Sequence, residues 1–180
     1  DYQPLPTPRL DPVHEEPPEY DLYGMFYKDI QLNFGESLSN PWIQDIVYRD
    51  PVHIALMLNP VTAEKKGLQA MDIVKVESPY GMIYGRIGVS QGWQPDTMGV
   101  SNALSRTTGK LGGVKHAGGH FNDLLPYDLR NTDGVTGQPE TVCKVKVTKL
   151  DDWPQFLKDG GSVYDMIDEL SEPGKGRKHH

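Results

Sequence analysis

The chain has 180 residues and a formal net charge of −7 at pH 7, which argues against nucleic acid or an anionic membrane surface as its partner. Its 19 glycines and 15 prolines indicate a loop-rich, mainly β protein, and no run of about 18 apolar residues could cross a membrane as a helix. The single cysteine, Cys143, excludes an internal disulfide, an all-cysteine zinc site and an iron–sulfur cluster held by this chain alone.

The first part of the chain predicts a linker followed by ordered structure. Residues 1–20 hold six prolines and five acidic residues, a composition typical of an extended linker from an upstream domain. After an apolar run and a polar loop, Asn40 and Pro41 predict a short helix over residues 41–49, with Asn40 as its N-cap and Pro41 at its first position.

Strand signals dominate the middle of the chain. Asn59-Pro60 starts a second short helix that Gly67 is placed to end in the left-handed conformation. Residues 72–78 alternate between apolar and polar, residues 79–81 form a turn, and residues 82–89 return, which together predict a hairpin. Six strands are predicted: 22–28, 52–58, 72–78, 82–90, 97–101 and 142–149.

Two further segments are distinctive. Residues 105–120 form a long, glycine-rich and basic loop, and loops of this length in compact domains are usually functional or disordered. Ser162 and Asp165 make a capping box for a last helix, so residues 151–180 are interpreted as a C-terminal helix and basic tail. Because helices interrupt the strands, many strand contacts must be non-sequential, and a small closed barrel, which leaves no edge unpaired, is the expected fold.

Three stretches in this order resemble one family. Residues 59–100 contain an Asn-Pro helix start, A-E-x-x-G at the helix end, and D-x-V-x-V-x-S-x-x-G in the hairpin. Residues 120–147 contain N-x-L, then T-G-x-P, then the last strand, and residues 26–42 end in N-P-W. Over roughly residues 20–150 the chain resembles the C-terminal domain of the dimethyl-sulfoxide-reductase superfamily of molybdopterin enzymes.

The chain departs from the family pattern at the start of the hairpin and in the first loop. The family usually has Gly-Asp where this chain has Met71-Asp72, and many members carry Arg and His where this chain has Lys28, Leu32 and Phe34.

The resemblance implies a six-stranded double-psi β-barrel over residues 21–150 that binds molybdopterin guanine dinucleotide with molybdenum or tungsten. Amides can serve the many donors and acceptors of a pterin, whereas lysine and free backbone N–H groups suit a pyrophosphate. No catalytic residue and no metal ligand is expected in this chain. The residues expected to bind the cofactor are Tyr27, Lys28, Gln31, Asn33, Gly35, Ser37, Asn102, His116, His120 and Asn122.

Several of these residues also have a plainer interpretation. The loop after the first strand could be an ordinary polar surface loop, and Asn122 could form an Asx-turn before Leu124. His116 and His120 lack a carboxylate or cysteine at metal spacing, so hydrogen bonding to the pterin or to upstream domains is favoured over a zinc site. Cys143 is expected to be a buried structural thiol.

The expected function is that of the C-terminal domain of an oxidoreductase large subunit, inactive as an isolated chain. Its expected partners are the upstream domains of the same subunit and an iron–sulfur electron-transfer subunit, with no nucleic acid. Two alternatives stay open: a free-standing barrel that binds a protein partner, as in the N-domains of some ATPases, and a small subunit like that of formylmethanofuran dehydrogenase. The sequence does not decide between a cytoplasmic and a periplasmic location.

Overall fold

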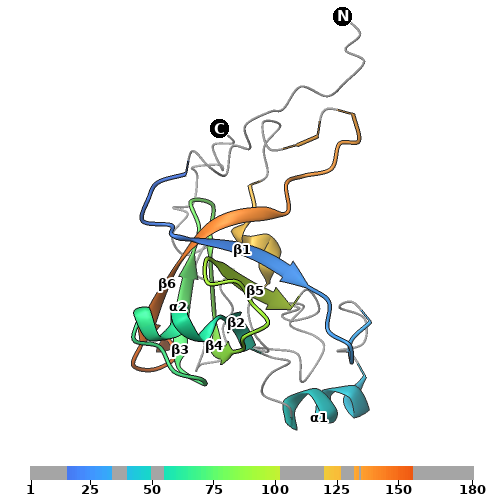
Figure 1. Cartoon of the computed structure of the whole chain (residues 1–180). Coiled ribbons are helices and arrows are strands. Elements are labelled where there is room, and N and C mark those ends of the chain that lie inside the picture. Colours follow the sequence, from blue (N-terminus) through green and yellow to red (C-terminus); the bar gives the residue numbers. More distant parts are fainter. Residues whose placement is uncertain are drawn as a thin grey trace, which may run out of the picture.

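The computed structural model describes residues 16–33, 40–49, 55–101, 120–126, 132–133 and 135–155. Within this part of the chain, six strands close into one barrel (Figure 1). The strands are β1 (Leu22–Tyr27), β2 (Ala55–Leu58), β3 (Ile73–Glu77), β4 (Met82–Val89), β5 (Thr97–Ser101) and β6 (Val142–Leu150). The predicted mainly β, closed six-stranded barrel is therefore confirmed.

The order of strands around the barrel differs from their order in the chain. It runs β1-β5-β2-β4-β3-β6, and the ring closes where β6 pairs with β1. The pairs β1/β5 and β2/β4 are parallel, while the remaining neighbours are antiparallel. Parallel neighbours need crossover connections, and this order agrees with the double-psi barrel that the family resemblance implies.

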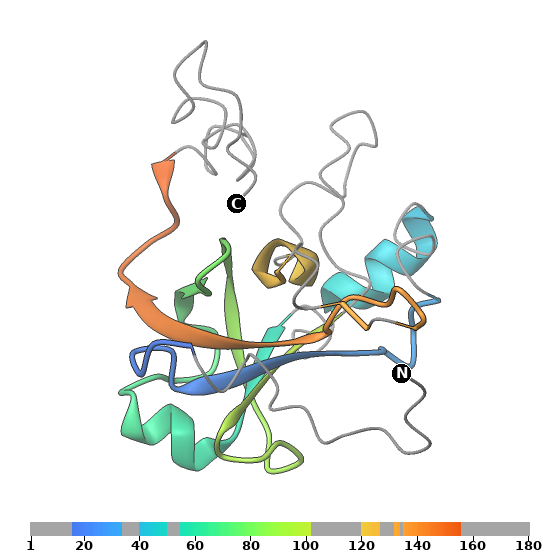
Figure 2. The ribbon, with the colours of Figure 1, turned by 90° about the horizontal axis from the view of Figure 1, so that it is seen from above.

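In the described part of the chain, three short helical segments accompany the barrel, and the predicted caps of the first two are confirmed. They are α1 (Pro41–Arg49), α2 (Pro60–Lys65) and the 3₁₀ turn η3 (Phe121–Leu124). The side-chain oxygen of Asn40 accepts from the Trp42 N–H at 3.0 Å, and that of Asn59 accepts from the Val61 N–H at 2.9 Å. Gly67 follows α2 with φ +65°, the left-handed conformation expected at a helix end. Figures 1 and 2 show α1 and α2 well apart, with α1 beyond the end of β1.

The barrel interior is an apolar core. On β3, Val74 and Val76 are fully buried while their neighbours are partly exposed, which is the period of two that alternation predicts. Cys143 on β6 is also fully buried, which confirms the expectation of a structural thiol. Among the described residues, the other apolar side chains with no exposed surface are Leu58, Ile87, Met98, Val100, Leu124 and Val145.

The ends of the chain are described only in part. Glu16 accepts a hydrogen bond from the backbone N–H of Lys144 at 2.7 Å, so the last residues of the predicted linker reach β6. Residues 52–54 of the predicted second strand, the loop residues 105–119 and the predicted last helix lie outside the described residues. Among the described residues, no helix is both long and apolar enough to cross a membrane.

Candidate functional site

Two parallel strands end side by side at one edge of the barrel. β1 and β5 are paired in register from Tyr23 with Thr97 to Tyr27 with Ser101. Parallel strands point the same way, so the segments that follow them leave the barrel together. The loop after β1 carries Lys28, Gln31 and Asn33, and the residue after Ser101 is Asn102. The pairing therefore places the starts of two predicted cofactor segments next to each other.

A buried polar contact joins these two strand ends. The hydroxyl of Ser101 donates a hydrogen bond to the carboxylate of Asp29. Ser101 has no exposed surface and Asp29 is 7% exposed, so both groups depend on protein partners rather than water. The sequence did not single out either residue, because no local pattern distinguishes a buried acidic residue after a strand from an exposed one.

Tyr27 lies near the Asp29 carboxylate and packs against the ring of Trp93. Its ring lies 5.3 Å from the ring of Trp93, centroid to centroid, at an interplanar angle of 60°. Burial, followed by the negative charge of Asp29, raises the pKa of the Tyr27 hydroxyl well above its ordinary value. The phenol therefore stays protonated at physiological pH and can serve as a hydrogen-bond donor.

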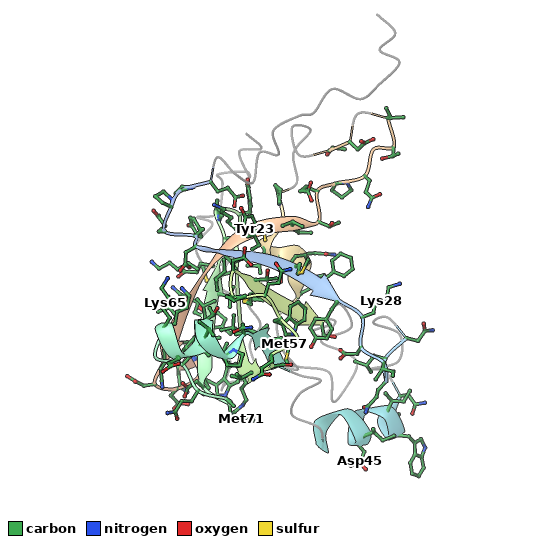
Figure 3. All side chains as sticks on the ribbon, in the orientation of Figure 1. Tyr23, Lys28, Asp45, Met57, Lys65 and Met71 are labelled. Atoms are coloured by element: carbon green, nitrogen blue, oxygen red, sulfur yellow. The ribbon has the colours of Figure 1, made fainter. Side chains whose placement is uncertain are left out.

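The loop after β1 alternates between anchoring and exposed residues. Asp29 and Leu32 are buried, whereas Lys28, Gln31 and Asn33 are exposed. Figure 3 shows the Lys28 side chain directed away from the barrel, on the segment between β1 and α1. Burial of Asp29 and Leu32 anchors the loop, and its cationic and amide side chains lie on the exposed side.

The η3 turn presents the second group of predicted residues. Phe121 and Leu124 are buried in the core, while Asn122 between them is exposed. Because Asn122 is exposed, its side-chain amide can offer donors and an acceptor to a group outside the barrel.

His120 supplies a second polar atom at this place. Its Nδ1 is buried and has no hydrogen-bond partner among the described residues. Buried nitrogens without a partner are uncommon in folded proteins, and each costs about 1–3 kcal/mol. The position of this nitrogen suits a partner group that is supplied from outside the described residues, such as a bound cofactor.

An aromatic contact brings the end of β1 and the η3 turn together. The rings of Phe26, at the end of β1, and Phe121, in η3, have centroids 5.8 Å apart and are tilted by 53°. Lys28, Gln31 and Asn33 follow Phe26 closely in the chain, and Asn122 follows Phe121. Six of the ten predicted residues are thus on two adjoining segments. Gly35, Ser37, Asn102 and His116 lie outside the described residues.

Other features of the described chain lie apart from this site. An open pocket beside α2 is lined by residues such as Pro60, Glu64 and Val89, and it includes none of the predicted site residues. Within the described ranges, no three His, Cys, Asp or Glu side chains gather as metal ligands would.

Comparison with known proteins identifies the family of this chain. The family model described as "Molydopterin dinucleotide binding domain" matches residues 44–143. The molybdopterin-containing subunit ArrA of arsenate respiratory reductase from Chrysiogenes arsenatis is 27% identical over 125 residues, which cover 64% of this chain and 15% of that protein. The ArrA subunit from Shewanella sp. (strain ANA-3) is 28% identical over 140 residues, covering 69% and 16%.

A solved structure shares the fold. Acetylene hydratase from Pelobacter acetylenicus superposes with a TM-score of 0.59 at 17% identity, over 74% of this chain and 19% of that chain. The chain thus spans about 15% of the length of the curated relatives it matches.

Proposed function

Because this chain belongs to the Molydopterin dinucleotide binding domain family, we propose that it is the C-terminal domain of the large subunit of a molybdenum or tungsten oxidoreductase. The domain's cofactor is molybdopterin guanine dinucleotide. Both curated relatives are named as subunits of a reductase, which favours redox chemistry over the hydration named for the more distant acetylene hydratase.

The observation that carries the proposal is the meeting of two polar segments at Phe26 and Phe121. The exposed amides of Gln31 and Asn122 can donate to ring acceptors and accept from ring amines of a pterin. The unpartnered Nδ1 of His120 would gain a partner from the same group. The cation of Lys28 suits a pyrophosphate. Asn33, Gly35, Ser37, Asn102 and His116 complete the proposed set, together with the donor hydroxyl of Tyr27.

In this proposal the chain binds the cofactor, and the cofactor carries out the chemistry. The bound metal would supply the redox change, while the residues of this chain would orient the pterins and exclude water around them. The isolated chain is therefore expected to have no turnover. Measuring substrate reduction with the purified chain and with the complete subunit separates the two roles.

The rest of the same subunit is the proposed main partner. Trp42 is 82% exposed and Ile46 is 55% exposed, four residues apart on α1 and therefore on one helix face. Large apolar side chains exposed together are typical of surfaces that pack against other protein. We place the upstream domains there. An iron–sulfur electron-transfer subunit is the second proposed partner.

The experiment that tests cofactor binding uses Asn122→Leu in the complete subunit. Leucine keeps the volume but leaves the pterin's polar groups without partners, which costs about 1–3 kcal/mol, or roughly ten- to a hundredfold in affinity. The variant should purify with less pterin and less metal per protein, while circular dichroism still reports a folded barrel.

Gln69→Leu is the matched control, because Gln69 is also an exposed amide but lies in the turn before β3. It should retain the cofactor content of the unmodified subunit. Full cofactor and activity in Asn122→Leu would remove Asn122 from the site and leave it as an ordinary surface residue.

A further inference from the structure

The turn between β3 and β4 holds the η3 segment through a buried serine. Ser78 is 6% exposed, and its Oγ donates to the carbonyl oxygen of Leu124 at 2.8 Å. The same oxygen accepts from the backbone N–H groups of Tyr80 at 3.1 Å and Gly81 at 3.2 Å. A hydroxyl has one proton and two lone pairs, so Ser78 accepts two hydrogen bonds within the turn and donates the one that joins the turn to η3.

Gly81 allows the same two segments to approach closely. A Cβ atom at this position would lie 2.1 Å from the carbonyl oxygen of Asp123, far inside the ~3.5 Å at which such atoms make favourable contact. Among the described glycines, positive φ occurs at Gly67 and Gly137. Gly81 is therefore required for space, and its backbone could otherwise suit any residue.

The opposite side of η3 is fixed by the core. Phe121 is 4% exposed and Leu124 has no exposed surface. Figure 2 shows the yellow η3 turn beside the tip of the green β3–β4 hairpin. The segment is held between the hairpin turn and the core, and this leaves Asn122 facing outward at a defined place.

We propose that Ser78 and Gly81 are positioning residues for cofactor binding, because they set the position of the η3 segment and thereby of Asn122 and His120. The proposal rests on the proposed function, since Asn122 and His120 bind the cofactor only there. Neither Ser78 nor Gly81 is itself placed in contact with the cofactor. Binding groups must be held within about 0.5 Å of the productive geometry, and the displacement that a methyl group on Gly81 forces is larger than this.

The first experiment measures the position of the η3 segment in the 180-residue chain without cofactor. The backbone N–H groups of Asp123 and Leu125 donate to the carbonyls of His120 and Asn122 at 3.0 and 3.2 Å. In Ser78→Ala and Gly81→Ala, these amides should exchange roughly tenfold faster, the effect of losing about one hydrogen bond. The side-chain amide resonances of Asn122 should shift in the NMR spectrum.

Matched controls come from a second serine–glycine turn. The Oγ of Ser90 accepts from the Gly92 N–H at 3.2 Å, and a Cβ on Gly92 would lie 3.5 Å from that oxygen, an ordinary contact. Ser90→Ala and Gly92→Ala should leave the Asn122 resonances in place. Ile87→Val, in the core of β4 away from the turn, should lower the melting temperature and also leave them in place, which separates positioning from general stability.

The second experiment measures cofactor content in the complete subunit. Gly81→Ala should purify with several-fold less pterin than Gly92→Ala. Unchanged Asn122 resonances and exchange rates in both turn variants would overturn the positioning role. Shifted resonances with full cofactor content would mean that the turn holds η3 but that η3 does not bind the cofactor, which overturns the assignment of Asn122 in the proposed function.

Discussion

The Ser101 hydroxyl donates a buried hydrogen bond to the Asp29 carboxylate, across 72 positions of sequence. It ties the segment after β1 to the end of β5, so the starts of two candidate cofactor loops share one anchor.

Removal of either partner is expected to destabilise the barrel. Ser101→Ala leaves a buried carboxylate with one donor fewer, and Asp29→Ala leaves a buried hydroxyl with one acceptor fewer, so each should lower the free energy of unfolding by about 1–3 kcal/mol. The double variant should cost less than the sum of the two. Urea unfolding measures all three, and strictly additive costs would mean that the two groups do not interact.

Met71 occupies a backbone conformation that suits glycine. Its φ is +72°, and the resembled family usually has glycine at this place. A non-glycine residue in the left-handed region costs about 1–2 kcal/mol, while glycine's greater freedom in the unfolded chain costs up to about 1 kcal/mol. Since Met71 is 42% exposed, little packing is lost, and Met71→Gly should raise stability by about 0.5–1 kcal/mol. A lower melting temperature of this variant would show that the methionine side chain contributes more than the strain costs.

The Cys143 thiol should be unreactive in the folded chain. Burial, and then the carboxylate of Glu16, raise its pKa from 9.0 to about 12. Because the thiolate is the reactive form, a chromogenic disulfide reagent at pH 8 should not react with the native chain and should react with one thiol per chain in denaturant. Rapid reaction of the native chain would mean that β6 opens locally.

The same pKa shift predicts an alkaline loss of stability. The folded thiol holds its proton to higher pH than the unfolded thiol, so its contribution is fully present below pH 9 and is lost as pH rises towards 12. Between pH 9 and pH 11 the free energy of unfolding should therefore fall more steeply for the natural chain than for Cys143→Ala. Equal slopes in urea titrations would contradict this origin.

Asn59 combines a helix cap with a contact to the loop before β5. Its side-chain oxygen accepts from Val61 N–H at 2.9 Å, and its side-chain nitrogen donates to the carbonyl oxygen of Trp93. Asn59→Asp keeps the cap acceptor but loses the donor, whereas Asn59→Ala loses both. Thermal unfolding should rank the natural chain above Asn59→Asp and that variant above Asn59→Ala, whose cap loss alone costs about 0.5–2 kcal/mol. Equal stability of the natural chain and Asn59→Asp would show that the Trp93 contact contributes nothing, whereas equal stability of the two variants would show that the cap contributes nothing.

Local signals in the sequence determined much of this protein. The alternation around Val74 and Val76, the caps at Asn40 and Asn59 and the left-handed Gly67 each depend on neighbours a few residues away. Such features are encoded by side-chain periodicity and by short-range hydrogen bonds, so the positions of the strands and of the first two helices could be predicted from the residues alone.

Only the tertiary structure decided how these elements meet. The parallel pairing of β1 with β5, the contact of Asp29 with Ser101 and that of Ser78 with Leu124 join residues 46 to 74 positions apart. Their partners are selected by closure of the barrel and by burial of the core, which no local pattern records. For this reason the sequence could name Asn122 as a candidate, while the residues that hold it in place became visible only in the folded chain.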